Sequence, residues 1–566
     1  MPIRAFPCGL VLLAASAAAQ PAVSAGAETQ RIRAGSVTPA SGGGWNVALT
    51  MDDDNGNAAL PSSYRRWWHV QIGNLAAGGE RLVVQVTNAG YSDVILPVWS
   101  LSGDGGASFG AWSRVPAGAT PVVNGTTHSF TLQTPPGTTA LRLAKYFPYG
   151  VADRDRFLAR VATHPKVRRV TSLGTTRQGR AVRLLELSDP AVPDGGKRRV
   201  WIHAGIHPAE TTGYFTVEGL VEYLLSGEPA AEVLLAGAIV QVVPMANPDG
   251  VALGNYRTNA NSVNLEDEWA APYASSEPEI VALRTAIEQA LGTPAAKAPQ
   301  PIAVLLNLHS SHNVAYPFHF QHSANAAFDL QSNRSGVIPP VNVLEGQWIA
   351  ALRARSAFVA RGATQSSTCG APARPFVECM AHDRWSIDPA WTAPPNPAAR
   401  LMAITLEGTY GRGPDGVNWN TPADYQRLGR ELALALGDYL ALLPGATLRA
   451  YGTSCGGMQM TGSVSKVAGA LRLDLAVRQA PVTPLAALVI GAQGAALPLP
   501  PSACLLLTEP WIVLPLGLDA RGAADVAVPL PPLPALLAHL QALAALDQGG
   551  VPAWRTSAGL RLDAAR

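Results

Sequence analysis

The feature that most constrains this chain is an alternation between residues 151 and 444, where short apolar segments alternate with amphipathic ones. The apolar segments have the length and composition of buried strands: AVRLLELS, RRVWIHAGI, AIVQVVPMA, PIAVLLNLH and RLMAITLEG. The segments between them space apolar residues at helical intervals, and one begins with Thr421 before Pro422, a favourable helix start. This alternation predicts an α/β domain with a mixed, largely parallel sheet.

One β-rich domain is predicted on each side of this α/β domain, because 566 residues exceed what one hydrophobic core usually holds. Residues 26–150 are rich in Gly, Thr, Ser and Val, with short alternating runs such as RLVVQVTNA and THSFTLQT, typical of an antiparallel β-sandwich. Residues 445–566 follow the break at LLPGATL and carry strand-like runs split by Pro and Gly. They predict a small β-rich accessory domain, in which PLPPLPALLAHLQALAALD is expected to hold one short helix.

The first 25 residues predict a signal peptide. Arg4 precedes an apolar run over residues 8–19, and SAAA or AVSA offers small residues for cleavage. The expected location is therefore secreted or periplasmic. No later stretch approaches the ~20 apolar residues of a membrane span.

Export places the cysteines in an oxidising compartment, where disulfides form. Removal of Cys8 with the leader leaves an even number, which allows three pairings: Cys369, Cys379, Cys455 and Cys504. Their spacing does not suit a zinc knuckle. We expect local pairing, Cys369 with Cys379 and Cys455 with Cys504, because each bridge then stays inside one predicted domain.

The overall charge argues against a polyanion partner. The chain has a net charge of +2 and only 14% charged residues, and it shows no basic stripe with interleaved aromatic residues. Nucleic acid is therefore not an expected partner. The sequence does not fix the oligomeric state.

Four side chains with metal-ligand or acid/base chemistry follow three of the predicted strands. RRVWIHAGI leads to His207 and Glu210, AVLLNLHSS ends in His309, and MAITLEGTY presents Glu407. The working groups of an α/β sheet gather at the carboxyl ends of its strands. Two histidines and one glutamate are the ligand set of an open catalytic zinc site, which also needs an unligated acid to take a proton from water.

These residues resemble the M14 zinc carboxypeptidases, and within them the cytosolic carboxypeptidase-like branch. The matching text is HAGIHPAETTG, VPMANPDGVALGNYR, LLNLHSSH and ITLEGTYG, in the family's order, and RRWWHVQIGN resembles that branch's amino-terminal β-domain. The resemblance covers about residues 30 to 443. It implies one zinc per chain held by His207, Glu210 and His309, with Glu407 as general base and acid and Arg257 stabilising the oxyanion.

The pattern breaks where the family binds the substrate's terminal carboxylate with an Asn-Arg pair in text like DLNRxW. This chain has NLEDEW, so Glu266 and Asp267 stand at those two positions as candidate substrate-binding residues. At ~4 Å and an effective dielectric of ~20, one unit-charge interaction is worth about 4 kcal/mol, so anions in place of a cation disfavour a free carboxylate.

Three explanations remain open at this stage. The substrate lacks a carboxylate there or presents an amine; another arginine restores the clamp, the candidates being Arg284, Arg374, Arg384 and Arg412; or the protein binds zinc without hydrolysing anything. The sequence favours a secreted zinc metallocarboxypeptidase that cleaves a peptide bond near a C-terminus with zinc-activated water and has altered specificity. The alternatives are a zinc amidase or deacylase acting on a capped or amine-bearing substrate, and a non-catalytic protein that binds a surface polymer.

Overall fold

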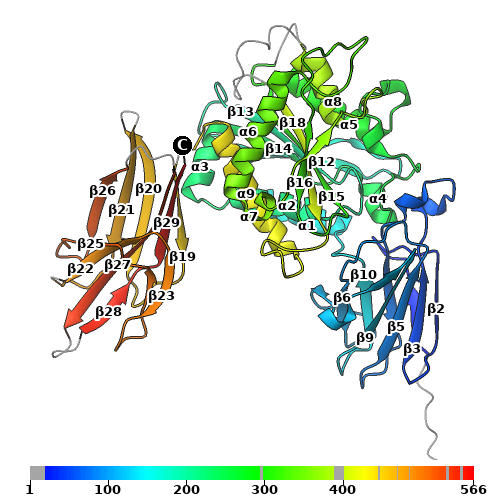
Figure 1. Ribbon diagram of the computed structural model, residues 1–566, viewed down its shortest axis with the longest axis horizontal. Coiled ribbons are helices and arrows are strands. Elements are labelled where there is room, and N and C mark those ends of the chain that lie inside the picture. The colour runs from blue at the N-terminus through cyan, green and yellow to red at the C-terminus, as the bar shows by residue number, and fades with distance from the viewer. Residues whose placement is uncertain are drawn as a thin grey trace, which may run out of the picture.

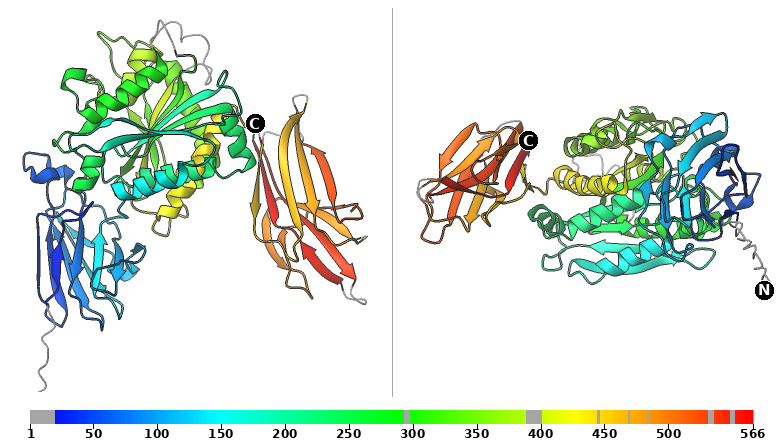
Figure 2. Two further views of the ribbon diagram at one scale, coloured as in Figure 1. Left: turned by 180° about the vertical axis from the view of Figure 1, so that it is seen from behind. Right: turned by 90° about the horizontal axis from the view of Figure 1, so that it is seen from below.

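The computed structural model describes residues 20–292, 298–387, 401–443, 446–467, 470–483, 485–530, 535–547 and 552–565. Three units follow one another along the chain: a β-unit, an α/β unit and a second β-unit (Figure 1). The views from behind and below show the α/β unit in the middle, with one β-unit at each end (Figure 2). Among the described residues, none of the helices combines the length and the apolar character that a membrane crossing requires.

The N-terminal unit consists of two five-stranded sheets. One has the order β1 (Ala22–Ser24), β4 (His69–Gly73), β10 (Ala140–Ala144), β6 (Val98–Ser102) and β7 (Ser113–Arg114). The other has the order β2 (Ala34–Pro39), β3 (Trp45–Thr50), β5 (Arg81–Thr87), β9 (Thr127–Gln133) and β8 (Val122–Asn124). Pairing is antiparallel as predicted, except that β3 and β5 run parallel.

Strand β1 corrects the predicted extent of the leader. Residues 22 to 24 pair antiparallel with β4, and the Gln20 side chain donates a hydrogen bond to the Val37 carbonyl. Residues 20–25 therefore belong to the N-terminal unit, and cleavage within AVSA would remove part of its sheet. Of the two predicted cleavage sites, SAAA at 16–19 leaves the strand intact; residues 1–19 lie outside the described part of the chain.

The α/β unit is built on an eight-stranded mixed sheet. Its order is β11 (Val167–Thr175), β12 (Ala181–Leu187), β14 (Ala238–Val243), β13 (Arg198–Ala204), β15 (Ile302–Ser311), β18 (Met402–Thr409), β16 (Phe318–His322) and β17 (Gln365–Ser367). The central neighbours β14, β13, β15 and β18 are parallel, and β12 and β16 flank them antiparallel.

Helices cover both faces of this sheet. They are α1 (Val151–Val161), α2 (Thr212–Leu224), α3 (Pro229–Gly237), α4 (Pro248–Leu253), α5 (Pro278–Leu291), α6 (Pro339–Arg355), α7 (Ala357–Ala360), α8 (Val377–Ala381) and α9 (Pro422–Tyr439). Successive residues of a strand face opposite sides, so Val200 and Ile202 of β13 enter the core with α2 and α9, and Trp201 enters the core with α5. Thr421 caps α9 reciprocally with Asp424, as its sequence predicts.

The C-terminal unit packs β-strands around a third core. Its main sheet has the order β19 (Ala446–Tyr451), β29 (Gly559–Ala565), β27 (Ala535–Asp547), β22 (Ala486–Gly491) and β25 (Ile512–Pro515), with β28 (Pro552–Thr556) on β27. A three-stranded sheet, β20 (Gln459–Val467), β21 (Ala470–Arg478) and β26 (Ala524–Pro529), and the pair β23 (Gly494–Pro498) and β24 (Leu505–Thr508) complete it.

The short helix predicted in this unit is wrong, because residues 535–547 form strand β27. Alanine and leucine favour a helix locally, but β27 pairs with β22, β28 and β29. Tertiary pairing overrides the local preference.

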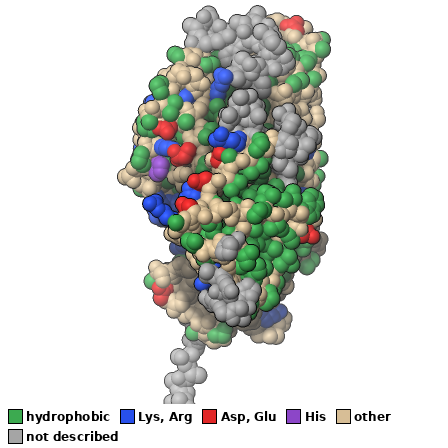
Figure 3. All heavy atoms as spheres, turned by 90° about the vertical axis from the view of Figure 1, so that its left-hand side faces the viewer, with side chains coloured by type: hydrophobic (Ala, Val, Ile, Leu, Met, Phe, Trp, Pro, Cys, Tyr) green, Lys and Arg blue, Asp and Glu red, His purple; other side chains and the backbone are tan. Residues whose placement is uncertain are grey.

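Both expected disulfides are present, Cys369–Cys379 and Cys455–Cys504. Hydrophobic side chains gather on the face of the C-terminal unit that Figure 3 shows. At the edge of its main sheet, Trp511 is 74% and Val513 58% exposed.

Candidate active site

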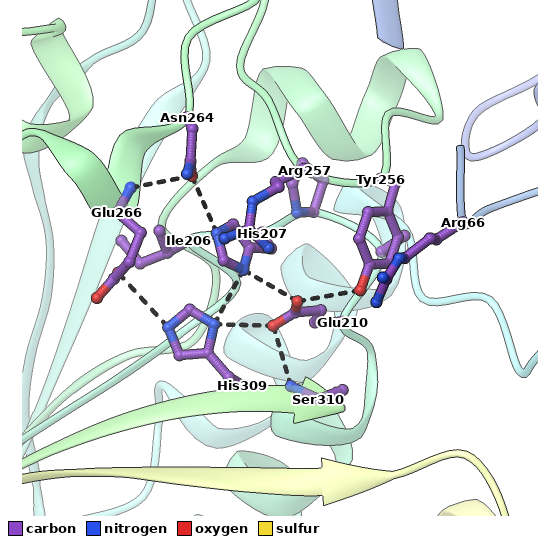
Figure 4. Close-up of polar contacts among 12 residues, drawn as sticks. Arg66, Ile206, His207, Glu210, Tyr256, Arg257, Asn264, Glu266, His309 and Ser310 are labelled. Carbon is purple, nitrogen blue, oxygen red and sulfur yellow. Dashed lines mark hydrogen bonds and ion pairs between the residues drawn. The ribbon is translucent and has the colours of Figure 1, made fainter. Parts of the chain in front are cut away.

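Three buried side chains converge at the carboxyl ends of β13 and β15 (Figure 4). His207 and Glu210 lie in the loop between β13 and α2, and His309 lies near the end of β15. Nδ1 of His207 is 2.9 Å from Oε1 of Glu210, and Nδ1 of His309 is 2.8 Å from its Oε2. The two Nδ1 atoms are 3.0 Å apart. Three potential ligand atoms therefore face one point.

The outer nitrogens of both histidines face acceptors. Nε2 of His207 is 3.0 Å from Oδ1 of Asn264, and Nε2 of His309 is 3.5 Å from Oε2 of Glu266. Since a carboxylate or amide oxygen accepts a hydrogen bond, each Nε2 carries the proton of a neutral imidazole. Each Nδ1 then turns a lone pair towards the other and towards Glu210.

This donor set fits a zinc ion. Two imidazole lone pairs and a carboxylate repel one another when no proton lies between them, unless a cation joins them. Tetrahedral zinc with ligands at about 2.0–2.1 Å holds its ligand atoms roughly 3.3 Å from one another. The contacts at the outer nitrogens are the kind that orient metal-ligating histidines.

The charges of the cluster also favour a cation. Burial alone would raise the pKa of Glu210, but His207 and His309 hold that pKa well below its usual range. Burial lowers the pKa of His309, yet Glu210 and Glu266 raise it well above its usual value. Positive charge at this point is therefore strongly stabilised.

Glu407 stands on the strand next to His309. Strand β18 pairs parallel with β15 in a register that places the two residues opposite each other. Burial, and then the charge of Glu210, raise the pKa of Glu407 to about 8, against the lowering effect of His309 and Arg257. A carboxyl group with such a pKa can accept and return a proton near neutral pH.

The loop after α4 brings Arg257 and Tyr256 to the other side of the cluster (Figure 4). The Tyr256 hydroxyl donates a hydrogen bond of 3.3 Å to Oε1 of Glu210. The Arg257 guanidinium lies 5.2 Å from the centre of the Tyr64 ring. Its charge lowers the pKa of His207, after the larger effect of burial.

A second polar group next to the site comes partly from the N-terminal unit. Nη1 of Arg66 is 3.2 Å from Nδ1 of His312, and Nζ of Lys145 is 3.2 Å from its Nε2. Because Arg66 only donates, Nδ1 of His312 accepts and Nε2 carries the proton, so Lys145 faces it as a neutral amine. Burial and the charge of Arg66 accordingly hold the pKa of Lys145 well below its usual range.

The residues at the expected carboxylate clamp have different surroundings. Glu266 is only 6% exposed and accepts hydrogen bonds from Asn307 (3.1 Å) and Trp269 (3.3 Å) while it faces His309. Asp267 is exposed and accepts a hydrogen bond of 2.6 Å from Asn264. Glu266 therefore supports a predicted metal ligand directly, a role that its sequence position did not indicate.

Four arginines were considered as a replacement clamp. None of their described partners belongs to the metal cluster, by which we mean His207, Glu210 and His309. Arg284 donates to the Ala271 carbonyl and stacks on Tyr273; Arg374 pairs with Asp383. Arg384 pairs with Glu288, and Arg412 donates to the Val417 carbonyl and stacks on Trp419. Arg257 and Arg66 are the arginines drawn next to Glu210 in Figure 4.

Several residues of this site were not predicted: Asn264, Tyr256, Lys145, His312 and Arg66. Tyr256 and Asn264 lie in segments already singled out, GNYR and NLED, so a closer examination of these motifs could have included them. Lys145 and Arg66 come from the N-terminal unit, and no motif connects them with the α/β unit.

Comparisons with known proteins show sequence similarity to zinc carboxypeptidases. Residues 155–265 match the model of a family described as Zinc carboxypeptidase, Peptidase_M14. Human cytosolic carboxypeptidase 2 is 30% identical over 169 residues, which are 29% of this chain and 19% of that protein. Cytosolic carboxypeptidase 6 of Mus musculus is 34% identical over 110 residues, 19% of this chain and 20% of that protein. The match thus spans about a fifth of these relatives' length.

Solved structures resemble a larger part of the chain. A metallo-carboxypeptidase from Burkholderia cenocepacia has a TM-score of 0.57 at 22% identity, covering 74% of this chain and 99% of its own. A metallo-carboxypeptidase from Pseudomonas aeruginosa, in complex with (2-guanidinoethylmercapto)succinic acid, has a TM-score of 0.57 at 21% identity, covering 75% and 100%. At these identities the likeness shows the fold.

Proposed function

We propose that this chain, whose α/β unit belongs to the Peptidase_M14 zinc carboxypeptidase family, hydrolyses a peptide bond near a C-terminus. The observation that carries the proposal is the convergence of His207, Glu210 and His309, with Glu407 on the next strand. Zinc held by these three ligands would polarise the scissile carbonyl and lower the pKa of a water molecule towards about 7.

The remaining roles fall to side chains of the chain itself. Glu407 takes the proton of the attacking water and passes it to the leaving nitrogen, for which its raised pKa is suited. Arg257 donates hydrogen bonds to the carbonyl oxygen as negative charge develops there. Asn264 and Glu266 hold the imidazole rings of His207 and His309 in the tautomer with a free Nδ1.

Substrate selection is proposed to differ from that of enzymes with an arginine clamp. Glu266 is buried, Asp267 is exposed, and the four alternative arginines are engaged elsewhere. A free carboxylate near Glu266 would meet a negative charge. A substrate with an amidated, branched or amine-bearing end avoids this repulsion, which also supports the second candidate, a zinc amidase or deacylase.

We also propose that the protein is exported to the periplasm or secreted. The two disulfides support it, because such bonds persist mainly in oxidising compartments.

A peptide digest with metal analysis tests the proposal. The purified protein should contain one zinc per chain, release C-terminal residues, and cleave amidated peptides at least as well as free ones. Glu407→Gln should retain zinc and lose about 10²–10⁴-fold in kcat, and His309→Ala should lose zinc. Glu288→Gln, the same change in a residue that pairs with Arg384, is the matched control. Full activity of Glu407→Gln would falsify the mechanism, and zinc without any peptide cleavage would favour the amidase.

A further inference from the structure

One acidic side chain of the N-terminal unit holds the loop that carries Arg257. Asp54 lies in the 3-10 turn η1 (Asp54–Gly56) and is 3% exposed. Its Oδ1 accepts the Tyr256 N–H at 2.7 Å, and its Oδ2 accepts those of Arg257 at 2.8 Å and Thr258 at 2.7 Å. Three consecutive backbone groups, with Arg257 in the middle, are thus bound to one carboxylate.

Neighbouring residues extend this contact on both sides. The Asn55 backbone donates to Oδ1 of Asn255 at 3.1 Å, and the Asn255 amide returns a bond of 2.9 Å to Asn55. The Asn55 amide also donates to the Asn259 carbonyl at 2.8 Å. Arg31 donates to the Leu253 carbonyl at 3.2 Å. The loop from 253 to 259 is therefore fixed from across the unit boundary.

The loop has little regular structure of its own to fix it. Helix α4 ends at Leu253, the residue after it, Gly254, has a φ of +68°, and a 3-10 turn begins only at Leu265. A side chain at Gly254 would meet the Gln30 carbonyl at 2.7 Å, so the N-terminal unit packs closely here as well. Backbone N–H groups outside helices and sheets need other partners when buried, and Asp54 supplies them.

Arg257 depends on this backbone support. Within the described residues, its buried Nε has no hydrogen-bond partner, and its guanidinium rests on Tyr64, another residue of the N-terminal unit. A displaced backbone would therefore move the guanidinium with it.

We propose that Asp54 is a positioning residue of the active site, which acts through Arg257, and that the N-terminal unit is thereby part of the catalytic apparatus. This inference rests on the proposed function. Burial raises the pKa of Asp54, although the three N–H groups lower it.

The test uses the full chain with Asp54→Asn. The amide group would turn N–H donors towards backbone N–H groups, so the loop should shift. Loss of an oxyanion donor, or a shift of about 1 Å, typically lowers turnover roughly 10²-fold. We expect kcat to fall by about 100-fold with little change in KM and with zinc retained.

Asp53→Asn is the matched control. Asp53 is 1% exposed, like its neighbour, but its carboxylate pairs with Arg33 and Arg65 inside the N-terminal unit. This variant should lower the melting temperature and leave kcat within about 3-fold. An equal loss of kcat in both variants would show a general structural effect and overturn the assignment.

A double-mutant cycle separates positioning from an independent role. If Asp54 acts through Arg257, Asp54→Asn combined with Arg257→Gln should be no slower than Arg257→Gln alone. If the fold losses of kcat in the two single variants multiply in the double variant, or if Asp54→Asn is fully active, the inference is overturned. Amide hydrogen exchange gives a readout free of turnover: Asp54→Asn should speed exchange at residues 256–258. If the wild-type protein is inactive but Asp54→Asn still speeds exchange at residues 256–258, the proposed function is refuted and the contact between Asp54 and the loop stands.

Discussion

The two β-units differ in how they meet the α/β unit. Asp54, Asn55 and Arg31 of the N-terminal unit bind the loop next to the metal cluster, and Lys145 and Arg66 flank His312. None of the described contacts of the metal-cluster side chains comes from residues 446–565. Two appended β-rich units in one chain can therefore differ, one contacting the loop next to this cluster and the other folding around a core of its own.

The same contrast appears at their surfaces. Buried polar residues of the N-terminal unit face the α/β unit, whereas the C-terminal unit exposes apolar side chains along strand β25. If the contrast is correct, changes to one unit should alter catalysis and changes to the other should not.

The largest expected effect is that of metal removal. Zinc at 1,000 times its Kd would stabilise the unit that binds it by about 4.1 kcal/mol, on the order of 10 °C. A chelator should therefore lower the calorimetric transition of the α/β unit and leave that of the C-terminal unit in place. His309→Ala is the control, since its transitions should not respond to the chelator. A shift of both transitions together would mean that the units melt as one.

Removal of the Cys455–Cys504 bridge should affect stability in the C-terminal unit alone. The bridge joins residues 49 apart, and loop entropy predicts a loss of about 4 kcal/mol for Cys455→Ser with Cys504→Ser. Thermal unfolding and peptide release measure the two consequences, and release should not change. The matched pair Cys369→Ser and Cys379→Ser, with a separation of 10, should lose about 3 kcal/mol in the α/β unit. Slower release after the first change would reveal a catalytic contribution of the C-terminal unit.

The smallest expected effect concerns Glu279 in the first turn of α5. Its side chain is fully buried, and burial raises its pKa from 4.5 to about 7. Between pH 4.5 and about 7 the folded protein keeps a proton on Glu279 that the unfolded chain has lost. The contribution of Glu279 to the free energy of unfolding therefore falls by about 3 kcal/mol as the pH rises through this range. Glu279→Gln should flatten this slope and be more stable than wild type at pH 8, as denaturant unfolding would measure. Glu288→Gln is the control, and an unchanged slope in Glu279→Gln would contradict the assignment.

The sequence predicted the parts of the site that lie at or just after the carboxyl ends of parallel strands. His207, Glu210, His309 and Glu407 each follow an apolar run, and adjacent parallel strands bring their carboxyl ends to one edge. The role of Glu266 could not be obtained in this way, because the direction of its side chain depends on Trp269, Asn307 and His309 together. The helix expected within residues 529–547 failed for a related reason: strand pairing decided its conformation.

By itself the sequence predicted the α/β architecture, the candidate metal ligands and the expected cysteine pairs, because strand and helix periodicity, residue chemistry and chain order are local properties. Only the tertiary structure decided that Asp54 supports Arg257 from about 200 residues away, that Glu266 faces His309, and that the alternative arginines are engaged elsewhere. Such contacts depend on how the units pack against each other, and their side chains leave no periodic pattern along the chain.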